Sequence, residues 1–183
     1  VTGTPGIQEL LGGIYATGET KINADLSNTV DFREFLTIGA KITWDLGAVE
    51  LTSITGYHEI ETNNVFDGDG TNLPWVITEF RRNEADQFSQ EIQLTSQHGG
   101  PIEWLLGGFF FSEDGSAAQM FNLALLGLRF HSGGQVDTTS YAAFGQATWH
   151  ATERLHVTAG LRWTQDEKDS DEFLDFMGLT TAD

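Results

Sequence analysis

The acidic stretch that begins at Asp67 is the first place where this sequence could bind a metal ion. Asp67 and Asp69 occupy the first and third positions of a calcium-loop pattern. The sixth position is Asn72 instead of glycine, and the twelfth is Thr78 instead of glutamate. The glycine allows the sharp turn and the glutamate supplies two oxygen ligands, so the pattern predicts no EF-hand site.

The five histidines also lack the spacing of a metal site or a catalytic centre. They are His58, His98, His131, His150 and His156. None forms an H-E-x-x-H pattern, and the sequence contains no G-x-S-x-G elbow, no G-x-x-x-x-G-K phosphate loop and no cysteine. Glu113 and Asp114 are adjacent, so on a strand they would point to opposite faces and could not act as a catalytic pair. We therefore predict no enzyme activity, no metal and no cofactor.

The overall charge argues against nucleic acid as a partner. The 183 residues include 27 Asp and Glu but only 9 Lys and Arg, which gives a formal net charge of -18. Such a chain repels a phosphate backbone. No run approaches the ~18 apolar residues of a membrane-spanning helix. With 21 glycines, 13 phenylalanines, 5 tryptophans and only 3 prolines, the composition favours β-structure.

The elements that must position these side chains are β-strands. In the segment 155–164 every odd position is apolar and every even position is polar or glycine, which is the period of a strand. Similar alternation marks residues 36–45, 49–59, 86–96 and 139–150, and residues 102–112 add an apolar strand. A less regular run covers Leu10 to Thr20. Short connections at 45–48, 97–101 and 151–154 predict antiparallel hairpins.

The connections differ in length at the two ends of these strands. The short turns alternate with long segments at residues 21–34, 61–84 and 113–136, which carry much of the negative charge, and an acidic tail follows Gln165. Trp44, Trp104 and Trp149 lie near the short turns, whereas Tyr15, Tyr57, Tyr141 and Trp163 lie near the long segments. This asymmetry is typical of an outer-membrane β-barrel, in which lipid requires every backbone polar group to be paired.

We therefore expect an all-β fold: an antiparallel up-and-down transmembrane β-barrel segment of about seven strands, each of roughly ten residues. Bacterial single-chain barrels have an even number of strands, from eight upward. The sequence starts without Met or a basic leader and does not end in an apolar strand. We interpret it as a fragment of a larger barrel.

Four stretches of this sequence resemble the barrel strands of TonB-dependent outer-membrane receptors. They are Ile54–Tyr57 (ITGY), Phe88–Leu94 (FSQEIQL), Tyr141–Ala147 (YAAFGQA) and Thr158–Lys168 (TAGLRWTQDEK). The resemblance extends from about Phe35 to Asp169. It implies that residues 1–183 are a partial barrel domain of a 22-stranded barrel. It also implies a plug domain and a TonB-binding box, neither of which is recognisable in this sequence.

The resemblance implies a receptor in the bacterial outer membrane that takes up a scarce ligand, such as a siderophore-like iron complex or another large nutrient. Its partners would be outer-membrane lipid, the TonB complex through a missing N-terminal region, and a small-molecule or metal-chelate ligand.

We place ligand capture on the long outer segments, because loops on a rigid scaffold are the usual binding elements. The candidate ligand-binding residues are Phe66, Asp67, Asp69, Asn72, Trp75, Phe121 and Phe130. The polar positions of the strands are expected to face the lumen of the barrel. These are Lys41, Thr43, Glu50, Thr52, His58, Gln146, Thr148, His156, Thr158 and Arg162.

Three other functions fit parts of the pattern. A passive outer-membrane porin would lack a plug domain upstream. An outer-membrane barrel enzyme would need His or Asp side chains that converge at one rim. A soluble secreted β-sandwich that binds carbohydrate would bury Leu36, Ile38, Val157 and Leu161 in a compact core.

Overall fold

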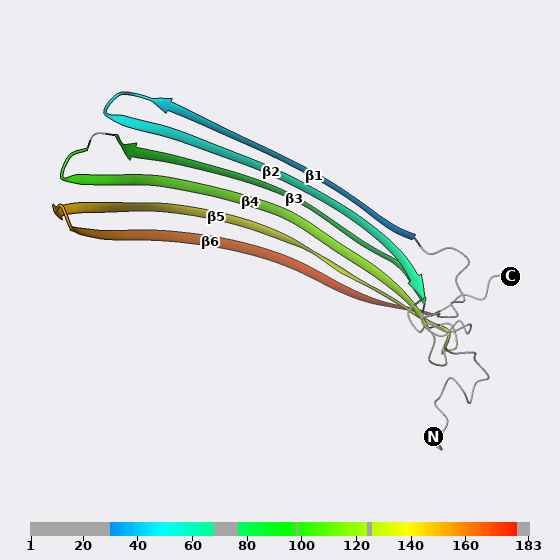
Figure 1. The fold of residues 1–183 in the computed structure, drawn as a ribbon. Helices are drawn as coiled ribbons and strands as arrows, with labels where there is room; N and C mark the ends of the chain where they lie inside the picture. The colour runs from blue at the N-terminus through cyan, green and yellow to red at the C-terminus, as the bar shows by residue number, and fades with distance from the viewer. Residues whose placement is uncertain (1–29, 68–76, 98, 124–125, 179–183) are drawn as a thin grey trace, which may run out of the picture.

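The described part of the chain is a single antiparallel sheet. The computed structural model describes residues 30–67, 77–97, 99–123 and 126–178. The strands lie side by side in sequence order, β1-β2-β3-β4-β5-β6 (Figure 1). They are β1 (Val30–Asp45), β2 (Val49–Asp67), β3 (Ile77–Ser96), β4 (Ile102–Leu123), β5 (Leu128–Thr152) and β6 (Leu155–Gly178). The predicted up-and-down antiparallel arrangement is confirmed, and the additional strand expected at residues 10–20 lies outside the described residues.

The short turns lie where the sequence places them. Between β1 and β2 the chain reverses at residues 46–48, where Gly47 has a φ of 87°, a left-handed conformation that glycine adopts without strain. Its backbone N–H donates to the Asp45 carboxylate at 2.7 Å, and the N–H of Leu46 donates to the carbonyl of Val49 at 2.9 Å. All three turns lie at one end of the sheet (Figure 1).

The strands are much longer than the predicted ten residues, and most of the expected long loops are strand. Strand lengths run from 16 residues in β1 to 25 in β5. The segment expected to connect β4 and β5, residues 113–136, is paired from Glu113↔Thr138 up to Leu123↔Leu128. The acidic tail after Gln165 is likewise part of β6. The loop assignments over these segments were wrong.

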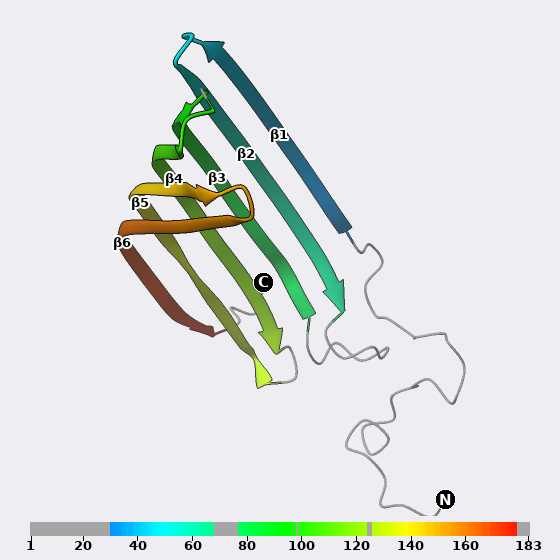
Figure 2. The same cartoon turned by 60° about the vertical axis from the view of Figure 1, so that its left-hand side comes forward.

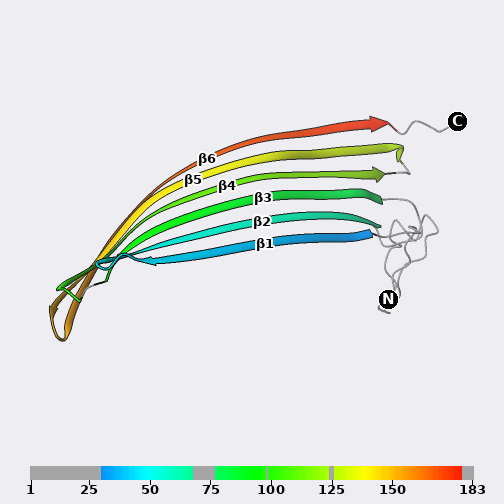
Figure 3. The same cartoon turned by 90° about the horizontal axis from the view of Figure 1, so that it is seen from above.

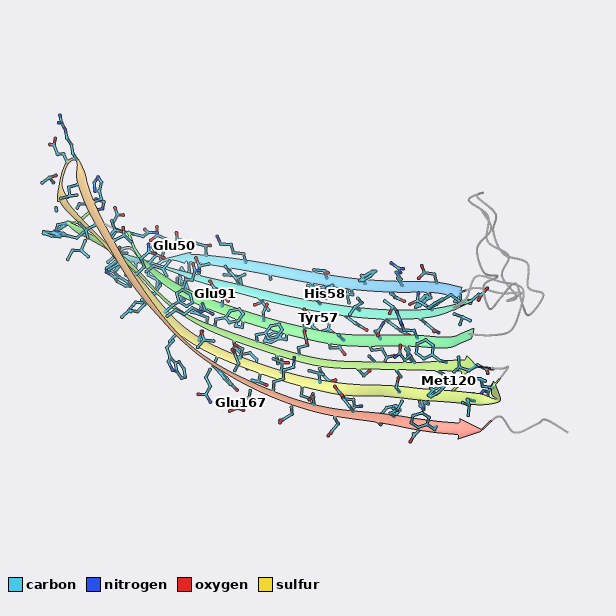
Figure 4. The ribbon with its side chains drawn as sticks, turned by 90° about the horizontal axis from the view of Figure 1, so that it is seen from below. Glu50, Tyr57, His58, Glu91, Met120 and Glu167 are labelled. Atoms are coloured by element: carbon cyan, nitrogen blue, oxygen red, sulfur yellow. The ribbon has the colours of Figure 1, made fainter. Side chains whose placement is uncertain are left out.

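The sheet is curved, and its two faces differ in chemistry. All six strands bend together into an arc (Figures 2 and 3). Figure 4 shows the side chain of Glu167 on the convex side of β6, and we name this side the outer face. Glu167 lies in one cross-strand row with Thr139, Ser112, Phe88, Tyr57 and Ile38. The opposite, concave side is the inner face.

Large apolar side chains cover the outer face next to the short turns. We call this surface the apolar band; Leu161 is 87% exposed there and Ile42 67%. Its main members are Ile38, Ile42, Trp44, Leu51, Tyr57, Phe88, Ile92, Leu94, Leu106, Tyr141, Leu161 and Trp163. All ten residues predicted to face a lumen lie on the inner face, where Thr52 is only 5% exposed. The alternation of the sequence therefore assigned these side chains to the correct faces.

Three polar residues interrupt the apolar band, and they bind one another. The Thr55 hydroxyl donates to the Gln90 side-chain oxygen at 2.6 Å, and the Gln90 amide donates to the Ser53 hydroxyl at 3.0 Å. A polar atom in an apolar medium is costly unless it is hydrogen-bonded. This cluster meets that requirement within the protein itself.

A row of carboxylates crosses the outer face directly beyond the apolar band. Five neighbouring strands each place one acidic residue at the same height, and we call this set the acid row. Its members are Glu59, Asp86, Asp114, Asp137 and Asp169. Tyr57, at the edge of the band, donates its hydroxyl to Asp86 at 2.8 Å. The negative charge thus lies on strands at the end remote from the turns.

Replacing Asp114 with asparagine is expected to stabilise the sheet by a small amount, on the order of 0.5 kcal/mol. Asp114 lies directly opposite Asp86 and Asp137, and like charges in such positions repel. The measurement is urea unfolding of the full-length protein in lipid vesicles. The gain should shrink at high salt, which screens exposed charges. Destabilisation, or a gain that salt leaves unchanged, would contradict the repulsion argument.

Candidate functional site

The predicted ligand-binding residues lie partly within strands. Phe66 and Asp67 end β2, Phe121 lies near the end of β4, and Phe130 lies near the start of β5. Their assignment to outer loops was therefore wrong. The other three candidates, Asp69, Asn72 and Trp75, lie outside the described residues.

Three of these residues belong to one row of phenylalanines on the inner face. Phe121 pairs with Phe130, Phe130 pairs with Phe176, and Phe66 joins the same row through the backbone of Thr78. The Phe130 and Phe176 rings meet edge to face with centroids 5.0 Å apart. Asp67 follows Phe66 in β2, so alternation turns it to the opposite face. Phe66, Phe121, Phe130 and Phe176 make up the phenylalanine row.

Sequence reasoning missed Phe176. It had treated everything after Gln165 as an acidic tail, whereas β6 continues to Gly178. The available signal was weak: Phe176 and Leu174 are separated by one residue, as in a strand, but carboxylates surround them. Register against β5 places Phe176 beside Phe130.

A hollow of about 940 Å³ lies on the inner face next to the phenylalanine row. This volume falls within the range of ordinary ligand pockets. Side chains that are small or absent form its floor: Ala85, Gly115, Ala117 and Gly134. Polar and charged side chains surround that floor: Arg81, Asn83, Glu113, Gln119, Ser132, Lys168 and Glu172. The hollow therefore combines an open floor with hydrogen-bonding groups of both charges.

Hydrogen bonds connect the polar side chains around this hollow. The Arg81 guanidinium donates to Gln119 at 3.4 Å, and the Gln119 amide donates to the Ser132 hydroxyl at 3.2 Å. Arg81 also lies over the Phe66 ring, 5.9 Å from its centroid. Both Arg81 contacts are with uncharged groups, so neither neutralises its positive charge. The arrangement can bind by stacking, hydrogen bonds and charge.

Catalytic chemistry finds no comparable arrangement in the described residues. Glu113 lies on the inner face and Asp114 on the outer face, as their adjacency predicts. Across residues 30–67, 77–97, 99–123 and 126–178, no three or more His, Asp or Glu side chains gather as a metal-binding group.

Comparison with known proteins places this sheet in a family. A family described as TonB dependent receptor-like, beta-barrel, matches residues 4–181, which is nearly the whole chain. The chain belongs to this family of receptor barrels. The resemblance of its strand sequences to TonB-dependent receptors is thereby confirmed, and the sheet is a section of such a barrel.

A solved structure shows the same fold for this section of a receptor barrel. The crystal structure of the ferric yersiniabactin uptake receptor FyuA from Yersinia pestis matches with a TM-score of 0.61 and 14% sequence identity. The match covers 79% of this chain and 24% of the FyuA chain, so the chain spans about a quarter of that receptor. No curated protein matches the chain. The described residues include no helix long and apolar enough to cross a membrane.

Membership of the receptor-barrel family gives the two faces their meaning. TonB-dependent receptor barrels are outer-membrane proteins, and transmembrane barrels carry an outward apolar band and a polar interior. A soluble sandwich would cover Leu36, Ile38, Val157 and Leu161 with a second layer, but all four are exposed on one sheet. The hollow and the phenylalanine row therefore lie on the lumenal wall of the barrel section.

Proposed function

We propose that this chain forms part of the wall of a TonB-dependent outer-membrane receptor that takes up a scarce, large ligand. The hollow next to the phenylalanine row carries this proposal, because it combines aromatic surface for stacking with the positively charged Arg81 side chain on the inner face. The siderophore-like iron complexes expected from the sequence are the first ligands to test. FyuA, which shares the fold, is a ferric yersiniabactin uptake receptor.

The proposed location is the bacterial outer membrane, with the apolar band against lipid. The 25 residues of β5, at ~3.3 Å each and a tilt of ~40°, rise about 60 Å. The apolar band of a transmembrane barrel is only ~25 Å tall. We infer that lipid surrounds the half of the wall near the turns. The other half, with the acid row and the hollow, then extends beyond the lipid bilayer.

The rest of the receptor lies beyond this chain in the proposal. Six strands in an open sheet leave β1 and β6 each with one neighbour among the described residues. We propose that residues 1–183 are a partial barrel domain of about 22 strands, closed by further strands of the same protein. A plug domain and a TonB-binding segment would come from the region upstream and would link transport to the TonB complex.

Energy dependence tests this proposal. Cells that express the full-length receptor are given ferric yersiniabactin and a panel of other ferric siderophores, each labelled with radioactive iron. We expect accumulation of at least one chelate that disappears when TonB is deleted. Accumulation that is independent of TonB would favour the passive porin, and no accumulation of any chelate would contradict the proposed ligand class.

Substitution of Arg81 by glutamine tests the location of the ligand site. We expect it to weaken binding of the chelate identified above about tenfold, which corresponds to ~1.4 kcal/mol. The control is Arg82→Gln, because Arg82 is the next residue, lies on the outer face and pairs with Glu61 at 3.3 Å. Affinity is measured by titration of the purified receptor. Equal affinities of the Arg81→Gln and Arg82→Gln variants would show that the ligand does not bind in the hollow.

A further inference from the structure

Two histidines face each other on the inner face at the end nearest the turns, far along the strands from the hollow. His150 in β5 and His156 in β6 are direct partners in the register of the sheet. Their rings meet edge to face with centroids 4.6 Å apart, and their Nδ1 atoms are 2.5 Å apart. Paired residues on neighbouring strands hold their Cβ atoms ~5 Å apart, so the backbone itself brings these imidazoles together.

A carboxylate lies on the other side of one of these rings. Glu103 in β4 places its Oε1 atom 3.2 Å from the Nε2 atom of His150. That Nε2 atom is shielded from solvent and has no well-directed hydrogen bond among the described residues. A proton on Nε2 is therefore attracted to Glu103, and this tautomer leaves the Nδ1 lone pair of His150 directed at His156.

This geometry matches what a borderline divalent metal ion requires. Neutral imidazole nitrogens are preferred ligands of Zn²⁺, Cu²⁺ and Ni²⁺, and a metal-bound histidine commonly donates its other N–H to a carboxylate. Zinc–nitrogen bonds of ~2.0–2.1 Å in a tetrahedral site hold two nitrogens about 3.3 Å apart. The two Nδ1 atoms would need to separate by less than about 1 Å from their present contact.

We propose that His150 and His156 form a two-histidine site for a divalent transition-metal ion, with Glu103 as a positioning residue. Water completes the coordination, since two protein nitrogens supply only part of it. Metal binding requires the proton on Nδ1 of His156 to move, by exchange with solvent, to Nε2 of the same ring, so that both Nδ1 lone pairs go to the metal and both neutral rings keep one N–H. The ion would clip β5 to β6 beside their connecting turn.

Cu²⁺ binding to the full-length receptor in chelator-free detergent tests this site. We expect an electron paramagnetic resonance spectrum with coupling to imidazole nitrogen. His150→Gln and His156→Gln should each weaken the affinity at least about tenfold, and Glu103→Gln should weaken it by about 10-fold. His58→Gln is the matched control, because His58 lies on the same face but bonds to the Thr37 hydroxyl at 2.8 Å.

The comparison uses only variants whose barrels keep the wild-type resistance to unfolding by detergent. Wild-type affinity in both His150→Gln and His156→Gln would overturn the proposal, as would a wild-type protein that binds no Cu²⁺ below about 1 mM. Loss of affinity in His58→Gln equal to that in His156→Gln would also overturn it. Ligand uptake plays no part in this measurement, so its outcome is separate from that of the proposed function.

Discussion

Replacing Ile92 with arginine is expected to destabilise the folded barrel by about 2 to 4 kcal/mol, as charged residues do near the middle of a lipid-facing band. Ile92 lies on the outer face between Ser53 of β2 and Gly108 of β4, and its side chain is 50% exposed. In the proposed orientation this exposed surface meets lipid tails. An arginine there would have to remain charged in hydrocarbon or extend along the wall to the headgroups.

Gln93→Arg provides the matched control for Ile92→Arg. Gln93 is the next residue of β3, lies on the inner face and donates its amide to the Glu91 carboxylate. An arginine at this position keeps a carboxylate neighbour and meets water, so we expect a change below about 1 kcal/mol. Urea unfolding of the full-length receptor in lipid vesicles measures both. Equal destabilisation by the two substitutions would show that Ile92 does not face lipid.

The alternation of the sequence was sufficient to predict the faces of the sheet, because one face is apolar over the half near the turns. Between Leu155 and Thr164 the contrast is complete, and the structure places Val157 and Leu161 outward with His156 and Arg162 inward. A shift of one residue would have reversed every side chain. The pattern therefore determined the face on which each side chain lies, although a shift of two residues would leave the faces unchanged.

The same alternation disappears in the acidic half, which explains the missed strand lengths. From Glu113 onward the outer positions of β4 change from apolar to Asp114 and Ser116, while the inner positions are Gly115 and Ala117. Hydrophobic periodicity is then lost although the ladder continues, because backbone groups make the pairing. Polar, glycine-rich segments without this alternation are typical of loops, and the sequence therefore predicted loops there. Strand length in this half is a property of the sheet as a whole.

The candidate site could be predicted only in part, because it depends on register between distant segments. Phe66, Phe121 and Phe130 were selected because they lie in the long segments expected to form outer loops, and the structure brings them into one row on neighbouring strands. The hollow could not be predicted, since its floor is formed by unremarkable residues such as Ala85 and Gly134. These residues matter only together, because small side chains at neighbouring positions on adjacent strands leave the open space of the hollow.

Gly107→Ala is expected to destabilise the barrel by about 1 to 3 kcal/mol, the usual effect of an extra methyl group in a filled space. A Cβ atom on Gly107 would overlap the Cζ atom of Phe144, whose ring covers this glycine across the β4–β5 pair. The same ring takes part in a cation–π contact, because the Arg162 guanidinium lies 5.4 Å from its centroid and 5.8 Å from the centroid of Phe109. The methyl group therefore has to displace the Phe144 ring and disturb its contact with Arg162.

Gly108→Ala isolates this effect, since it adds the same methyl group one residue along β4. There a Cβ atom would meet only the Ala142 carbonyl oxygen at 3.9 Å, an ordinary contact, so we expect little change. A Phe144→Ala background supplies the second comparison. In the Phe144→Ala background, Gly107→Ala should change the free energy of unfolding by less than about 0.5 kcal/mol. The effects of Gly107→Ala and Phe144→Ala, measured by unfolding in vesicles, should therefore be strongly non-additive. Additive effects would mean that Gly107 is needed for its backbone conformation and not for the space it leaves to Phe144.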